Sequence, residues 1–259
     1  MVTAMSFDRA ADFYDATRAL PPDVHDRLTE MLLAELAPRR LCLEIGVGTG
    51  RIALPLVEGG VHMIGADIAR KMLERLVVNA GGRQVPPLCV ADVTVLPFVS
   101  GAFDAVLASH LLHLVPDWRT TVDESVRVLH PGSVFLVDFG GAPPAPWHET
   151  ISAVLKDNGV VRMRPGMSDP GPVIEHLKGR ARARPLTPLV FPVARSLGQD
   201  LDDWEAQRHS WTWSLSRAQV ETAVNTVRGW AADNDWPLDR RVTLERTIQW
   251  WAFDIASSD

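Results

Sequence analysis

Residues 41–50 read LCLEIGVGTG, a short apolar run followed by three glycines at alternate positions. A continuous apolar run is typical of a strand buried on both faces of a parallel sheet. The glycines permit positive φ angles and a close approach of backbone to ligand. Helical spacing follows over 50–58, and a helix N-terminus offers free N–H groups and a positive dipole. The stretch predicts a nucleoside cofactor site or, alternatively, a tight strand–helix turn without a ligand.

The alternation of strand and helix continues on both sides of this stretch. Strands are predicted over 61–66, 87–91, 103–109 and 133–139, and helices over 8–20, 22–36, 69–79 and 117–129. Such alternation implies right-handed crossovers and an open, mostly parallel sheet. After Gly140-Gly141 the pattern changes, with helices predicted over 147–158 and 170–179 and two more within 200–235. Strands are predicted over 183–195, where three prolines favour a sheet edge or bulges, and over 240–254.

Composition limits the class of protein. The 259 residues are 46% hydrophobic, with a formal net charge of −6, so we expect a packed soluble core and no nucleic-acid partner. Cys42 and Cys89 lie in apolar runs and are expected as small buried residues, not as a disulfide or metal pair. No signal-peptide core and no membrane-spanning stretch are found, so a cytoplasmic protein without a membrane partner is expected.

Two nucleoside cofactors compete for the glycine loop. Gly48-x-Gly50-x-x-Ala53 matches the dinucleotide pattern with alanine in its last position, and Asp67 ends the second strand, where an acidic side chain takes ribose hydroxyls. The loop by itself does not choose between a nicotinamide dinucleotide and S-adenosylmethionine.

Four further features, in this order and spacing, favour the second cofactor. They are Glu44, Asp92 in the stretch VADV, the stretch FDAV at 103–106, and SVRVLHPGS at 125–133. Together they resemble the class I S-adenosylmethionine-dependent methyltransferases, and more narrowly the type 11-like, small-molecule branch that includes ubiquinone and menaquinone biosynthesis enzymes. The resemblance is strong over residues 40–140. Ser133 departs from it, since the family usually has a second glycine there; this should alter a turn and not the ligand site.

The resemblance implies a doubly wound α/β fold with a seven-stranded, mostly parallel sheet of the Rossmann-like methyltransferase type. We expect a single domain over 1–259. Within it, 1–38 would form an N-terminal helical lid, 39–140 the cofactor-binding core, and 141–259 the acceptor side. A helical insertion is expected at about 197–238.

The resemblance also implies roles for individual residues. Glu44 and the loop glycines would hold the methionine portion of the cofactor, Asp67 the ribose hydroxyls, Asp92 the adenine amino group, and residues after the fourth strand the methionine end. The predicted cofactor residues are Glu44, Gly46, Gly48, Gly50, Asp67, Ile68, Asp92, Val93, Ser109 and His110. Helix capping is the alternative role for Asp67 and Asp92.

Methyl transfer is an in-line displacement, for which alignment is the main requirement. A general base is needed only when the nucleophile arrives protonated. His113 and His110 follow the fourth strand with a spacing of three, which puts both on one helical face, and are the candidate bases. The alternative is a hydrogen-bonded histidine pair that supports a loop.

The acceptor candidates are less specific. Tyr14 and Arg18 share a face of the N-terminal helix and are expected to line the pocket or to mark the boundary between surface and core. His209, Trp211 and Trp213 are expected at an acceptor wall suited to a hydrophobic, aromatic or cationic molecule. The core of a helical insertion is the alternative for most of the tryptophans.

The sequence therefore predicts methyl transfer from S-adenosylmethionine to a small molecule, with S-adenosylhomocysteine as product and no metal. A non-methylating S-adenosylmethionine-binding protein remains an alternative. A nicotinamide-dependent oxidoreductase is disfavoured because no Tyr-x-x-x-Lys pair is present. An RNA methyltransferase is disfavoured by the acidic charge and by SHLL at 109–112 in place of an Asn/Asp-Pro-Pro-aromatic motif.

Overall fold

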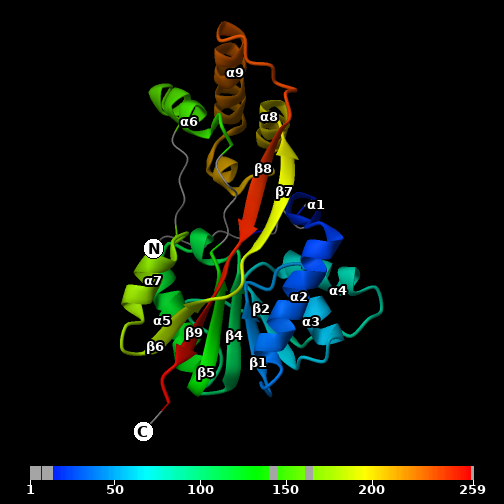
Figure 1. The fold of residues 1–259 in the computed structure, drawn as a ribbon, viewed down its shortest axis with the longest axis vertical. Coiled ribbons are helices and arrows are strands. Elements are labelled where there is room, and N and C mark those ends of the chain that lie inside the picture. The colour runs from blue at the N-terminus through cyan, green and yellow to red at the C-terminus, as the bar shows by residue number, and fades with distance from the viewer. Residues whose placement is uncertain (1–6, 8–13, 140–144, 161–165, 258–259) are drawn as a thin grey trace. The chain divides into compact units, whose positions relative to one another are not determined.

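The computed structural model describes residue 7 and residues 14–139, 145–160 and 166–257, which form the elements drawn in Figure 1. The chain divides into two compact units. The first contains Met1–Gly141, Pro165–Leu189 and Ile248–Asp259, and the second contains Ala142–Arg164 and Val190–Thr247. A single domain over 1–259 stays a prediction.

The first unit is built on a seven-stranded sheet with the order β3-β2-β1-β4-β5-β9-β6. The strands are β1 (Cys42–Ile45), β2 (Met63–Asp67), β3 (Leu88–Val90), β4 (Phe103–Ser109), β5 (Leu129–Asp138), β6 (Ala181–Pro185) and β9 (Trp250–Ile255). The first five pair in parallel, whereas β9 runs antiparallel to both of its neighbours. The predicted seven-stranded, mostly parallel α/β sheet is confirmed.

Helices cover the sheet from two sides, with α2, α3 and α4 on one and α5 and α7 on the other (Figure 1). Their bounds are α2 Pro22–Leu36, α3 Ala53–Glu58, α4 Arg70–Ala80, α5 Trp118–Val128 and α7 Pro170–His176, and a short helix α1 spans Tyr14–Arg18. All four residues of β1 are buried because this central strand has covered faces on both sides. Residues 8–13 of the predicted N-terminal helix lie outside the described residues.

Two predicted strands are wrong in extent, because each is divided between two sheets. The strand predicted over 183–195 separates into β6 and β7 (Leu189–Arg195), with Pro188 between them. The strand predicted over 240–254 separates into β8 (Val242–Ile248) and β9, because β8 pairs with β7 while β9 pairs with β5 and β6. Gln249 marks the break, and its side-chain amide donates to the Leu186 carbonyl over 2.7 Å.

The second unit contains α6 (His148–Asp157), α8 (Leu197–Glu205), the short 3-10 helix η2 (Ser210–Ser214) and α9 (Arg217–Asp233), together with most of the β7–β8 pair. Helices within the predicted insertion are thus present. Its core gathers Trp204, Trp230 and Trp236, for which an insertion core was the alternative, together with Trp147 from the segment before α6. Trp211, a predicted acceptor residue, also packs against this core. Trp250 and Trp251 lie instead in β9 of the first unit.

Among the described residues, no helix has the length and apolar character needed to cross a bilayer. Cys42 is buried in β1 and Cys89 half-buried in β3, and both are free thiols. Burial raises the pKa of the Cys42 thiol to about 12. Cys42 is therefore the small buried residue that the sequence predicts, whereas Cys89 is buried less than predicted.

Gly50 offers a test of how tightly the glycine loop is packed. Its φ is +84°, and an added Cβ would lie 2.7 Å from Leu76 and 2.9 Å from Leu54. Gly50→Ala should lower the free energy of unfolding by about 2–4 kcal/mol, the sum of left-handed strain and overpacking. Gly60→Ala is the matched control, because φ is +91° but a Cβ would meet nothing within 4 Å. Equal losses in urea unfolding of the two variants would show that packing around Gly50 contributes nothing.

Candidate active site

A cavity in the first unit lies at the carboxyl ends of β1, β2 and β4, where ligands bind in sheets of this kind. Its lining comes from the loops that follow β1, β2, β3 and β4, because parallel strands deliver these loops to one edge of the sheet. Eight of the ten predicted cofactor residues line it: Gly46, Gly48, Asp67, Ile68, Asp92, Val93, Ser109 and His110. Glu44 and Gly50, the other two, do not.

Glu44 lies in β1 directly before the glycine loop and is only 1% exposed. Its Oε2 is buried without a hydrogen-bond partner. Burial raises the pKa of this carboxyl to about 8; the charge of Arg51 opposes the rise and that of Asp67 adds to it. A buried carboxyl with an unsatisfied oxygen is costly unless a ligand supplies a donor. The unsatisfied Oε2 of Glu44 can therefore accept a hydrogen bond from a cationic donor such as the ammonium group of a methionine moiety.

The glycine loop follows β1 with positive φ at Gly46 (+65°) and Gly48 (+56°). A Cβ on Gly46 would lie 2.8 Å from the Leu111 side chain, so the backbone there is in close contact with the loop after β4. At Gly48 an added Cβ would meet the Met72 side chain at 3.4 Å and the Gly46 carbonyl at 3.9 Å, which are ordinary contacts. The left-handed backbone therefore favours glycine at both positions, and close packing against Leu111 adds to this at Gly46.

Asp67, the last residue of β2, accepts hydrogen bonds from two backbone amides. Its Oδ2 accepts from Gly48 N and its Oδ1 from Ala69 N, both over 2.8 Å. Ala69 is the N-cap residue of α4, so Asp67 also fixes the start of that helix. Each carboxylate oxygen has a second lone pair, so these bonds are compatible with the predicted contacts to ribose hydroxyls.

Asp92 is exposed after β3, and its Oδ1 accepts from both the amide and the hydroxyl of Thr94 over 2.9 and 2.7 Å. Among the described residues no helix begins at Asp92, so Asp92 is not a helix cap. Ile68 lines the same cavity and is 36% exposed. Ile68 and Val93 therefore give the cavity an apolar wall beside two carboxylates.

At the end of β4, His110 lies beside Asp138 and Ser109 lies beside Arg51. His110 has a left-handed backbone with φ +50°, and its Nε2 lies 3.2 Å from Asp138 Oδ2. Asp138 ends β5 and stands opposite Ser109 in the parallel register. Ser109 Oγ accepts from the Arg51 guanidinium over 3.3 Å. Sequence analysis missed Asp138, although an acidic residue at the carboxyl end of a strand was the signal that identified Asp67 and Asp92.

His113 does not line the cavity, although its ring centroid lies 6.1 Å from that of His110. The prediction that both imidazoles share a helical face is wrong. The 3-10 helix η1 spans Leu112–Leu114, and His110 precedes it in a left-handed conformation. The chain turn, and not a helix, brings the two rings near each other.

Helix α1 is joined to the glycine loop by one carboxylate. Asp15 accepts from the Thr49 hydroxyl over 2.5 Å and from the Asn79 amide of α4 over 2.8 Å. The preceding residue, Tyr14, lines the cavity, and the Arg18 guanidinium lies 5.9 Å from the Tyr14 ring centroid. Asp15 therefore holds the helix that supplies Tyr14. No sequence signal marked it, because its partners are 34 and 64 residues away.

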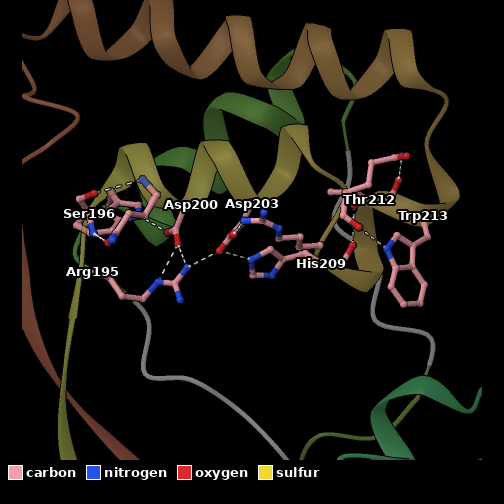
Figure 2. A network of polar contacts seen from close by, with 11 residues as sticks. Arg195, Ser196, Asp200, Asp203, His209, Thr212 and Trp213 are labelled. Carbon is pink, nitrogen blue, oxygen red and sulfur yellow. Dashed lines mark hydrogen bonds and ion pairs between the residues drawn. The ribbon is translucent and has the colours of Figure 1, made fainter. Parts of the chain in front are cut away.

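The remaining acceptor candidates, His209, Trp211 and Trp213, belong to the second unit. Figure 2 shows His209 directed at Asp203, which also contacts Arg195. The pKa of Asp203 is lowered to about 2, and the hydrogen bond from His209 is the main cause. Trp213 donates to the Gln207 carbonyl over 2.7 Å. Trp211 packs edge-on against Trp204. All three side chains thus stabilise the second unit, and their acceptor role stays a prediction.

The part of the chain around this cavity is similar to known methyltransferases. Residues 43–137 match the model of the methyltransferase domain family, a span that includes the strands around the cavity. A demethylmenaquinone methyltransferase of Clavibacter sepedonicus is 35% identical over 149 residues, covering 56% of this chain and 60% of that protein. A malonyl-[acyl-carrier protein] O-methyltransferase of Legionella pneumophila is 34% identical over 128 residues, covering 48% of this chain and 43% of that protein.

The chain thus spans about 60% or less of the length of these two curated relatives. Among solved structures, phosphoethanolamine N-methyltransferase 2 of Haemonchus contortus, in complex with S-adenosyl-L-methionine, is similar with a TM-score of 0.55. The match covers 97% of this chain and 57% of that one at 14% identity. At that identity the likeness supports the fold alone.

The raised pKa of Glu44 makes a prediction about stability and pH. The unfolded chain loses this proton near the ordinary glutamate pKa of 4.5, whereas the folded chain keeps it up to about pH 8. The free energy of unfolding should therefore fall as pH rises through this window, by roughly 1.4 kcal/mol per unit of pKa difference. Glu44→Gln should remove this decline in urea titrations at pH 5, 7 and 9. The exposed Glu58→Gln is the control, and a Glu44→Gln profile parallel to that of wild type would contradict the assignment.

The hydrogen bonds of Asp15 lead to a second prediction, about the rate at which a ligand leaves the cavity. Asp15→Ala removes both bonds that join α1 to the loop and to α4. A ligand in the cavity, with S-adenosylhomocysteine as the probe, should therefore dissociate about 5- to 150-fold faster, since the loss of two hydrogen bonds is worth about 1–3 kcal/mol. Stopped-flow displacement measures the rate, and the exposed Asp23→Ala in the first turn of α2 is the control. Unchanged dissociation in Asp15→Ala would mean that α1 does not hold the ligand.

Proposed function

We propose that this chain is a class I S-adenosylmethionine-dependent methyltransferase, which transfers the methyl group of S-adenosylmethionine to a small-molecule acceptor. The observation that carries the proposal is the cavity at the ends of β1, β2 and β4, with the unsatisfied oxygen of Glu44 beneath its glycine loop. When bound, S-adenosylmethionine supplies an electrophilic methyl group on a positively charged sulfur.

The buried Glu44 and the carboxylates of the cavity would contact different parts of the cofactor. Glu44 would face the ammonium group, Asp67 the ribose hydroxyls, and Asp92 the adenine amino group, so each carboxylate meets a donor or a cation. Ile68 and Val93 would cover the adenine faces. The glycine loop brings backbone close to the methionine portion, as its positive φ angles allow.

The acceptor is a small molecule in this proposal. The two relatives are named for different acceptors, demethylmenaquinone and malonyl-[acyl-carrier protein], so they do not fix this one. We keep the predicted hydrophobic or aromatic character of the acceptor, because Leu111, Leu114 and Val115 line the cavity beside His110. A cytoplasmic location and the absence of a nucleic-acid partner are parts of the same proposal.

Ligand binding tests the proposal directly. S-Adenosylhomocysteine should raise the melting temperature and bind in calorimetry, whereas NAD(H) and NADP(H) should do neither. Glu44→Gln should weaken binding about 10- to 100-fold, since a charged hydrogen bond is worth about 1.5–3 kcal/mol. Glu58→Gln should bind like wild type.

Stabilisation by a nicotinamide dinucleotide alone would overturn the proposal. Tight S-adenosylmethionine binding without transfer to any member of a broad acceptor panel would favour a non-methylating binder.

A further inference from the structure

We propose that the first unit contains a second ligand site, next to the glycine loop but separate from the cofactor cavity, which binds a small organic monocarboxylate with a short apolar body. This ligand is neither the cofactor nor the methyl acceptor, so the site stands apart from the proposed methyl transfer.

The first support is a second cavity, of about 340 Å³, between the glycine loop and the helices beside it. Its lining comes from α1 and the segment that follows it, from α2 and α3, and from the end of α4 (Figure 1). Small-molecule sites in proteins have volumes of roughly 300–1,000 Å³. Among the described residues the two linings have no member in common. Gly46 and Gly48 line the cofactor cavity, whereas Thr49, Gly50 and Arg51 line this one.

The second support is the apolar part of this lining. Leu20, which lies between α1 and α2, contributes to it, as do Leu54 and Pro55 of α3. A ligand that covers apolar side chains removes them from water, which favours binding in proportion to the area covered. This part of the cavity therefore suits a short, branched hydrocarbon group.

The third support is the guanidinium of Arg51, which is half-buried in the lining. Among the described residues its one hydrogen bond runs from Nη2 to Ser109 Oγ over 3.3 Å. A guanidinium has five N–H donors in a fixed fork, so most of them are left for a ligand. His25 Nε2 donates to the Arg51 carbonyl over 3.1 Å, which ties the Arg51 backbone to α2. A carboxylate matches such a fork with two parallel hydrogen bonds.

The other charged groups of the described lining already have partners. Arg83 donates to the Glu58 carboxylate and to two backbone carbonyls. Asp15 accepts one hydrogen bond on each of its carboxylate oxygens. A cationic head group would have to compete with these bonds for Asp15, whereas an anionic one meets the unused donors of Arg51. One guanidinium balances one negative charge, so a monoanion fits better than a dicarboxylate.

The test compares three molecules that carry the same isobutyl group on different head groups: isovalerate, isovaleramide and isoamylamine. Each is titrated into the full chain at pH 7.5 and followed in ¹H–¹⁵N NMR spectra. Isovalerate should bind with a Kd in the millimolar range or tighter and should shift the amide signals of Thr49 and Gly50. The amide and the amine should bind about tenfold more weakly or worse, because they lose the charged hydrogen bonds. Acetate should also bind more weakly, because it lacks the apolar body.

Two arginines of the same lining provide a matched pair of variants. Arg51→Gln should weaken isovalerate binding about 10- to 100-fold and bring it close to that of isovaleramide. Arg83→Gln should change it by less than about threefold, because the donors of Arg83 are already used. Leu20→Ser leaves both arginines in place and tests the apolar part separately. It should weaken isovalerate but not acetate.

Saturating S-adenosylhomocysteine should leave isovalerate bound, because the described linings of the two cavities are separate. Displacement of isovalerate by S-adenosylhomocysteine would assign Arg51 to the cofactor cavity and overturn the inference. Three further results would overturn it: isoamylamine binding as tightly as isovalerate, equal losses in Arg51→Gln and Arg83→Gln, and no isovalerate binding at millimolar concentrations. A chain that binds isovalerate but not S-adenosylhomocysteine would contradict the proposed function alone.

Discussion

The two hydrogen bonds accepted by Asp67 are the constraint on which the site depends. One carboxylate joins the glycine loop through Gly48 N and the entry to α4 through Ala69 N. Parallel pairing of β1 with β2 brings these segments to the same edge of the sheet. A carboxylate held by two amides keeps a fixed orientation, so its remaining lone pairs point in directions set before any ligand arrives.

The carboxylates at this edge of the sheet lie in different environments. Asp67 is satisfied by backbone amides, Asp92 is exposed, and Glu44 is buried with an unsatisfied oxygen. Asp138 is buried beside His110. Four acidic groups near one cavity therefore differ in the partners they can still accept. Their differences, more than their number, match a cofactor that has an ammonium group, hydroxyls and an exocyclic amine.

The sheet and most residues that line the cavity could be predicted because their signals are local in sequence. An apolar run, alternate glycines and an acidic residue at a strand end each specify their surroundings within a few residues. The C-terminal strands were harder to predict, since 183–195 and 240–254 each change partners midway. The break at Gln249 depends on a hydrogen bond to Leu186, 63 residues away, and no local periodicity reports such a contact.

The sequence by itself determined that the loop at Gly46–Gly50 follows a buried strand, and that Asp67 and Asp92 lie at the ends of two further strands. These positions come together because the carboxyl ends of parallel strands lie at the same edge of a sheet. Only the tertiary structure decided which histidine reaches the cavity. The sequence pattern does not distinguish His110 from His113, because both follow the fourth strand at helical spacing. The left-handed turn after β4 places His110 in the lining of the cavity, with Asp138 behind it. That choice depends on the register between β4 and β5, which is a property of two strands and not of either segment alone.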